Sequence, residues 1–170
     1  FMLDDGRAFK GMKEVKQLLD EMAILKMNTF HWHLTEDQGW RIEIKKYPLL
    51  TEIGAHRDST QLNWYESKVF DGKPFDGYYT QREIKEIVSY ARNLHITVVP
   101  EIEMPGHASA AIAAYPWLGS TDEKIKVPCT FGVKNSAFNV ADPRTRTFLK
   151  DVLDEVMELF PSRIIHIGGD

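Results

Sequence analysis

The chain has 170 residues, of which 43% are hydrophobic and 27% charged, and this composition excludes a disordered segment or a coiled coil. Its 21 basic and 25 acidic residues give a net charge of −4, so no basic surface predicts a nucleic-acid partner. No apolar run approaches the ~18 residues of a membrane span. A single cysteine, Cys129, excludes an internal disulfide.

The two ends of the sequence carry their own information. The chain opens on FMLDDGRAF, without the basic and small-residue pattern of a signal peptide. It stops on SRIIHIGGD, where an apolar strand pattern breaks off at a charged residue. We therefore expect residues 1–170 to be one part of a longer domain.

Three segments show the apolar spacing of amphipathic helices. They cover residues 12–26, residues 80–94 and a stretch that opens at Asp142-Pro143 and ends at Pro161. The second begins with a threonine that is followed three residues later by a glutamate, which predicts a capping box. A proline in the first position suits the start of the third helix.

Short apolar runs between these helices predict strands over residues 27–34, 96–102 and 163–167, with residues 1–3 as a further short strand. Nearly continuous apolarity is typical of parallel strands that are covered on both faces. The alternation of strand and helix predicts an α/β fold. A doubly wound nucleotide-binding sheet requires a glycine-rich turn after its first strand, but Asp4-Asp5-Gly6-Arg7 stands there.

A (β/α)8 barrel instead predicts chemically capable side chains at the C-terminal end of each strand. Such residues follow all four predicted strands: Arg7; Glu36 and Asp37; Glu101, Glu103 and His107; and Asp170. We therefore predict four strands and three helices of the barrel, about half of a fold that needs roughly 250 residues. The long segments 35–79 and 104–142 follow strands and are expected at the face that carries the site.

These strand-end residues form a candidate site. Each carboxylate alone could be a structural ion-pair partner, but a cluster of charged groups is costly to desolvate unless its members pair. The turn at residues 104–107 would aim His107 into the barrel mouth, where Glu103 could set its tautomer or charge. Gly168 and Gly169 permit close approach of a ligand beside Asp170.

The HWH run offers an alternative chemistry. His31 and His33 lie two apart on a predicted strand and therefore on one face. Together with His107 they could hold a metal in a metal-dependent barrel enzyme. No third ligand has a spacing that compels a metal, so we expect neither a metal nor another cofactor.

Four segments resemble the catalytic domain of glycoside hydrolase family 20, the β-N-acetylhexosaminidases: LDDGRAF at 3–9, KMNTFHWHLTEDQGWRIEIKKYPLLTEIGAHR at 26–57, VVPEIEMPGHASAAIAAYP at 98–116 and FPSRIIHIGGD at 160–170. The resemblance implies a retaining exo-glycosidase. Its substrate would be an oligosaccharide or glycoconjugate, such as chitin or another glycan, with terminal β-linked N-acetylglucosamine or N-acetylgalactosamine. The nucleophile would be the substrate's own 2-acetamido oxygen. The resemblance also implies a secreted, periplasmic or lysosomal protein.

The resemblance implies roles for individual residues. Asp170 matches the aspartate that orients the acetamido group, and the general acid would be the glutamate that follows it in the family's GGDE motif. Arg7 resembles the arginine that binds hydroxyls of the terminal sugar. Glu36 stands where the family usually has aspartate, and its longer side chain, with Asp37 beside it, could make the same substrate contact.

Glu103 and His107 resemble the family's supporting pair, which tunes the surroundings of the acid. On this resemblance, residues 1–170 are the N-terminal part of a single catalytic barrel, cut at the catalytic Asp-Glu motif. We expect the isolated chain to need the rest of the barrel, to be inactive and to self-associate through its open sheet edge. The alternative is a non-catalytic sugar-binding or interaction module that retains half of the site.

Overall fold

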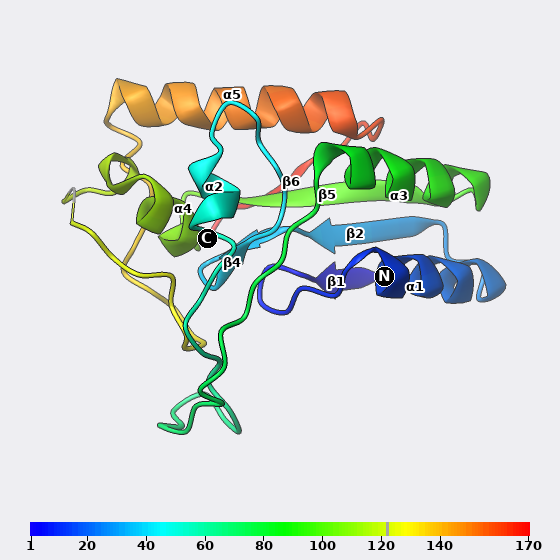
Figure 1. Ribbon diagram of the computed structural model, residues 1–170. Coiled ribbons are helices and arrows are strands. Elements are labelled where there is room, and N and C mark those ends of the chain that lie inside the picture. The colour runs from blue at the N-terminus through cyan, green and yellow to red at the C-terminus, as the bar shows by residue number, and fades with distance from the viewer. Residues whose placement is uncertain (122) are drawn as a thin grey trace.

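The computed structural model describes residues 1–121 and 123–170 and contains one four-stranded parallel sheet (Figure 1). Its strands are β1 (Met2–Asp4), β2 (Thr29–His33), β5 (Thr97–Met104) and β6 (His166–Gly168), hydrogen-bonded in that order. Sheet order therefore follows chain order, as in a barrel, whereas a doubly wound sheet changes direction at a switch point. The observed order agrees with the predicted barrel segment.

Three long helices run alongside these strands: α1 (Met12–Ile24), α3 (Gln81–Asn93) and α5 (Pro143–Leu159) (Figure 1). The predicted capping box of α3 is confirmed, since the Glu83 N–H donates to the Thr80 hydroxyl and the Thr80 N–H donates to the Glu83 carboxylate. At α5, the Asp142 side chain accepts the Arg144 N–H at 2.8 Å. Within the described ranges, every helix is too short or too polar to cross a membrane.

Segments predicted as long loops contain further short elements. An antiparallel ribbon of β3 (Thr35–Glu36) and β4 (Gly39–Trp40) follows β2, and α2 (Leu49–Glu52) comes next. After β5 come α4 (Ser109–Ala114) and the 3₁₀ turn η1 (Pro116–Leu118). Elements of two to six residues carry no measurable periodicity, so the sequence does not reveal them.

The predicted start of the last strand at residue 163 is wrong. Pairing begins only where His166 lies opposite Glu101, and Ile164 is 64% exposed. Among the described residues β6 is an edge strand whose one neighbour is β5, and residues 163–165 make no pairing with that strand, so they approach the sheet without extended hydrogen bonding. The link between α5 and β6 is correspondingly longer than the predicted one.

Alternation along the strands gives the sheet one apolar and one polar face. On β2, Phe30 and Trp32 are fully buried and join the apolar stripes of the helices in one core cluster. His31 and His33 lie between them in sequence and approach Glu101 on the opposite face. The sheet thus carries titratable groups on the face that its long helices leave uncovered.

Arg41 fixes the ribbon to the end of β1. Its guanidinium is fully buried and donates only to backbone carbonyls, at 2.7–3.2 Å; these belong to Asp5, Gly6, Gln38, Ala55 and Gly77. Burial lowers the pKa of Arg41 to about 10, helped by the positive charge of Arg57. The loops that frame the polar face are therefore fastened by one buried cation.

Candidate active site

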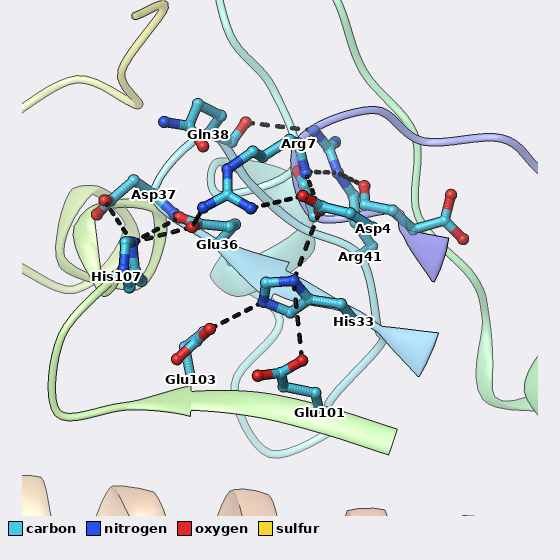
Figure 2. Close-up of polar contacts among 12 residues, drawn as sticks. Asp4, Arg7, His33, Glu36, Asp37, Gln38, Arg41, Glu101, Glu103 and His107 are labelled. Carbon is cyan, nitrogen blue, oxygen red and sulfur yellow. Dashed lines mark hydrogen bonds and ion pairs between the residues drawn. The ribbon is translucent and has the colours of Figure 1, made fainter. Parts of the chain in front are cut away.

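Arg7 lies directly after β1, between two carboxylates (Figure 2). Its Nη1 is 2.5 Å from Asp4 Oδ2, and its Nη2 contacts Glu36 Oε1. The Arg7 side chain remains 35% exposed, whereas the Glu36 side chain is fully buried. The guanidinium is therefore held in one orientation and still reaches solvent.

Glu36 is the last residue of β3, and Asp37 begins the turn that leads to β4. Asp37 Oδ1 accepts two hydrogen bonds from Ser109, from the backbone N–H at 3.0 Å and from the hydroxyl at 2.5 Å. Burial raises the pKa of Glu36, although the Asp37 N–H, Arg7 and His107 favour its charged form. Two adjacent buried carboxylates therefore need positive charge beside them.

His107 supplies that charge and joins the two carboxylates to Asp170. Its Nδ1 lies 2.9 Å from Glu36 Oε1 and 3.1 Å from Asp37 Oδ2, and its Nε2 lies 3.2 Å from Asp170 Oδ2. Burial by itself lowers the pKa of His107, but the negative charges of Glu36 and Asp37 outweigh it and raise the pKa above its ordinary value. The imidazolium form donates on both sides, which suits this arrangement.

The turn after β5 needs close backbone approach. Gly106 N donates to Asp170 O at 2.9 Å, and a Cβ on Gly106 would lie 2.3 Å from that oxygen. His107 adopts φ +47°, a left-handed conformation that is uncommon for a non-glycine residue. At Gly168, φ is +66° and a Cβ would lie 1.6 Å from Glu103 Oε2. The protein's own carboxylate occupies the space that the sequence assigns to a ligand.

The sequence predicts that Glu103 supports His107, but in the structure Glu103 is buried and contacts His33 instead. Its Oε1 is 3.0 Å from Nε2 of the buried His33, and among the described residues it makes no direct hydrogen bond or ion pair with the His107 ring. Burial lowers the pKa of His33, but Glu103, Asp4 and Glu101 outweigh it and raise the pKa. Figure 2 shows this contact between Glu103 and His33, and the negative charge of Glu103 also helps to raise the pKa of His107.

Three groups of residues bring metal-ligand atoms within 4.8 Å of one another: His31, Glu101 and His166; His33, Glu101 and Glu103; and Glu36, Asp37 and His107. His31, His33 and His107 thus belong to three different groups, and no group among the described residues unites them. His31 Nε2 lies 2.6 Å from Glu101 Oε2, which is within hydrogen-bond distance. Contacts between the side chains themselves account for these groups, and we assign no metal to them.

Two members of the polar face are missing from the sequence-based candidates. Asp4 orients Arg7, and its position at the end of β1 satisfies the same strand-end criterion that selects Arg7. His166 Nδ1 lies 2.8 Å from Glu101 Oε1. Its orientation depends on the register between β5 and β6, for which the sequence carries no signal.

Arginine, histidine and carboxylates gather at the C-terminal ends of the parallel strands, which is where (β/α)8 barrels carry their sites. The chain belongs to glycosyl hydrolase family 20: the model of that family's catalytic domain matches residues 1–170.

Named relatives of this chain support its assignment to the family. A beta-hexosaminidase of Porphyromonas gingivalis is 48% identical over 170 residues, which are 100% of this chain and 21% of the relative. A beta-hexosaminidase of Vibrio furnissii is 46% identical over 99% of this chain and 28% of its own length. The chain therefore spans less than a third of either relative.

Solved structures give the same result. The beta-N-acetylhexosaminidase of Bacteroides fragilis matches with a TM-score of 0.82 and 48% identity, over 100% of this chain and 31% of that one. The Streptomyces plicatus N-acetyl-beta-hexosaminidase in complex with Thio-NAglucal matches with a TM-score of 0.87 and 43% identity, over 99% and 32%. Such enzymes are TIM barrels, so the predicted partial (β/α)8 fold is confirmed.

Proposed function

We propose that these residues are the N-terminal part of one catalytic barrel, in a retaining exo-glycosidase that removes terminal β-linked N-acetylglucosamine or N-acetylgalactosamine. The carrying observation is the line of groups from Glu36 and Asp37 through His107 to Asp170. It ends in a carboxylate that is 77% exposed. The relatives' names and the sugar analogue bound to the Streptomyces plicatus enzyme support the substrate class. Such an enzyme would act where glycans are exposed, in a secreted, periplasmic or lysosomal setting.

In the proposed reaction, the substrate's 2-acetamido oxygen attacks the anomeric carbon while the glycosidic bond breaks and its oxygen takes a proton from the general acid. The acid is the glutamate that follows the aspartate in the family motif. The Asp170 carboxylate orients the acetamido N–H and stabilises the positive charge of the oxazolinium-type intermediate. Water then attacks the anomeric carbon as the bond from this carbon to the acetamido oxygen breaks, and the ionised glutamate takes the proton of the water. The two inversions give net retention.

His107 is the positioning residue for Asp170. A proton on Nε2 donates to the Asp170 carboxylate and restricts its rotation. Glu36 and Asp37 keep that proton in place, because their negative charges raise the pKa of His107 against the effect of burial. Both carboxylates are buried, so they act through His107 and Arg7 rather than by direct contact with the sugar.

Arg7 binds hydroxyls of the terminal sugar. Its two Nη atoms each carry two N–H groups, and the contacts with Asp4 and Glu36 require one from each. The remaining N–H groups can donate to neighbouring hydroxyls in the forked geometry for which guanidinium is suited. A neutral sugar is recognised here by directed hydrogen bonds.

The test uses a polypeptide extended beyond residue 170 to complete the barrel. It is assayed with an aryl N-acetyl-β-glucosaminide and with the plain aryl β-glucoside, which lacks the acetamido group. We expect cleavage of the acetamido substrate alone. Failure on both substrates by a folded protein would contradict the proposal and favour the non-catalytic sugar-binding module.

The 170-residue chain by itself is expected not to turn over the acetamido substrate, since the general acid and the later strands lie outside it. Purified chain is assayed at increasing concentration. Turnover proportional to the amount of chain would contradict this expectation.

A further inference from the structure

A row of titratable side chains crosses the sheet at one level. Asp4 on β1 is in register with His33 on β2, and His33 is in register with Glu101 on β5. Glu101 is in turn in register with His166 on β6. Acid and imidazole therefore alternate along the row, whereas branched apolar side chains ordinarily dominate the interior of a (β/α)8 barrel. The proposed reaction leaves the imidazole of His33 without a task.

His33 is the least exposed member of this row and faces three carboxylates (Figure 2). Its side chain is 4% exposed. The ring Nε2 lies 3.0 Å from Glu103 Oε1, and the ring Nδ1 lies 3.7 Å from Asp4 Oδ1 and 3.9 Å from Glu101 Oε2. All of these contacts lie within residues 4–103.

The carboxylates on both sides of the ring determine the charge of His33. A neutral imidazole has one N–H group and one lone pair, so it would turn a lone pair toward a carboxylate. The imidazolium has an N–H group on both sides. Burial lowers the pKa of His33, but Glu103, Asp4 and Glu101 outweigh it and raise the pKa. Glu101 also has His31 and His166 beside it, whereas Glu103 has no ion-pair partner but His33 among the described residues.

Asp4 connects this buried charge to Arg7. Asp4 Oδ1, which faces His33, accepts the backbone N–H of Arg7 at 3.0 Å, and Asp4 Oδ2 lies 2.5 Å from Arg7 Nη1. The backbone carbonyl of His33 accepts the N–H groups of Asp5 and Gly6 at 3.0 and 3.1 Å. The carboxylate that orients Arg7 therefore lies between a buried cation and a cation that reaches solvent.

We propose that His33 is a positioning residue for substrate binding: held by Glu103, its imidazolium fixes Asp4 and thereby orients the Arg7 guanidinium. The inference rests on the proposed function, in which Arg7 donates to hydroxyls of the terminal sugar. This line of support lies inside the sheet and is separate from the line that passes through His107. Without the charge of His33, Asp4 is free to rotate and the N–H groups of Arg7 lose their fixed direction.

The test is a double-mutant cycle in the complete polypeptide, with kcat and KM measured on an aryl N-acetyl-β-glucosaminide. His33→Gln removes the charge, and Arg7→Ala removes the group on which His33 is proposed to act. We expect His33→Gln alone to lower kcat/KM roughly tenfold, mainly through a higher KM, and less than about twofold when Arg7 is already alanine.

His31→Gln is the matched control, because His31 lies on the same strand and face and forms its ion pair with Glu101. We expect it to change kcat/KM less than about twofold, with or without Arg7→Ala. Urea unfolding on the same preparations separates these losses from a loss of folded protein. The inference is overturned if His33→Gln costs the same with and without Arg7, or no more than His31→Gln.

Histidine NMR of the complete polypeptide, labelled at ¹³Cε1, gives a readout that needs no turnover. The His33 signal is identified by its absence from whichever of His33→Gln and His33→Asn folds. We expect it to titrate above the ordinary value of about 6.5, and a neutral ring at lower pH would overturn the inference.

A folded, unsubstituted polypeptide that cleaves no acetamido substrate would contradict the proposed function instead. The same cycle is then measured as binding of N-acetylglucosamine by calorimetry. Weaker binding by His33→Gln than by His31→Gln, with no further loss in the Arg7→Ala background, supports the positioning role. Equal binding by the two variants, or no binding at all, overturns it.

Discussion

Two polar clusters lie at the strand ends, and they differ in how their charges are satisfied. The closed cluster consists of Asp5, Trp32, Arg41 and Tyr79, which are all buried. The open cluster consists of Asp4, Arg7, Glu36, Asp37, His107 and Asp170. Both contain arginine and carboxylate, so residue type alone does not separate them.

In the closed cluster the polar groups are satisfied by hydrogen bonds to other groups of the chain. Arg41 donates to backbone carbonyls, and Asp5 Oδ2 accepts from Trp32 Nε1 at 2.7 Å and from the Tyr79 hydroxyl at 2.8 Å. In the open cluster Arg7 and His107 face an excess of carboxylates, and Arg7 and Asp170 reach the surface. A closed cluster stabilises the fold, whereas an open one is held in place and keeps the capacity to bind a ligand.

The largest expected effect is on stability and comes from the closed cluster. Arg41→Ala leaves several buried carbonyls without a donor and should lower the free energy of unfolding by about 3–5 kcal/mol. Urea titration of the complete polypeptide, followed by tryptophan fluorescence, measures it. Arg7→Ala is the matched comparison, with a smaller expected loss of about 1–2 kcal/mol, because the buried Glu36 loses one partner but keeps His107 and the Asp37 N–H. Similar losses from the two variants would remove the distinction between the clusters.

Arg7→Ala should have a large effect on activity, although its effect on stability is the smaller of the two arginine variants. In the complete polypeptide, Arg7→Ala should lower kcat/KM on the acetamido substrate roughly 100-fold, or about 2.7 kcal/mol, because the guanidinium no longer donates to the sugar. The midpoint of urea unfolding should fall less than it does in Arg41→Ala. Full activity in Arg7→Ala would exclude this residue from substrate binding.

Tyr79→Phe removes one hydroxyl from the closed cluster and keeps the ring. The hydroxyl donates to Asp5 and accepts from the Gly11 N–H at 3.0 Å, so we expect a loss of about 1 kcal/mol in unfolding free energy. Tyr90→Phe is the control, since its exposed hydroxyl contacts only Asp20. A loss in Tyr79→Phe no greater than that in the control would show that the cluster contributes little.

The smallest expected effect is the pH dependence of the open cluster. Burial lowers the pKa of His107, but Glu36 and Asp37 hold it above its ordinary value in the folded chain. A raised folded pKa gives stability that is complete below the unfolded value, about 6.5, and is lost as the pH rises through the folded value. The difference in unfolding free energy between the unsubstituted chain and His107→Gln should therefore shrink as the pH rises. If the difference in unfolding free energy were constant from pH 5 to pH 9, His107 would not be held in its protonated form by the fold.

The sequence predicts the long elements well, because an apolar stripe on a helix and a continuous apolar strand each leave a repeated pattern. Thr80 and Glu83 even reveal the cap of α3. The ribbon of β3 and β4 has no such pattern, although it carries Glu36 to Arg7 and His107. The ribbon is stabilised by contacts with segments distant in the sequence rather than by a local sequence preference.

The strand-end criterion finds every residue of the open cluster except Asp4, but it does not reveal how these residues pair. Glu103 pairs with His33 because of the register between β2 and β5, which no local pattern encodes. Arg41 has no sequence signal, since arginine is ordinarily exposed and its burial depends on five carbonyls from four separate segments. Asp37 is found as a candidate, yet its bonds to Ser109 emerge only when α4 packs beside the ribbon.

The central claim is that the line from Glu36 and Asp37 through His107 ends in a carboxylate that acts on the substrate's acetamido group. Asp170→Ala in the complete polypeptide tests it most directly, with kcat on the aryl N-acetyl-β-glucosaminide and urea unfolding measured on the same preparation. We predict a loss of kcat of about 100- to 1,000-fold, as for removal of one charge-stabilising group, with unfolding unchanged. Activity retained within a few-fold, or a loss that matches a loss of folded protein, would contradict the account.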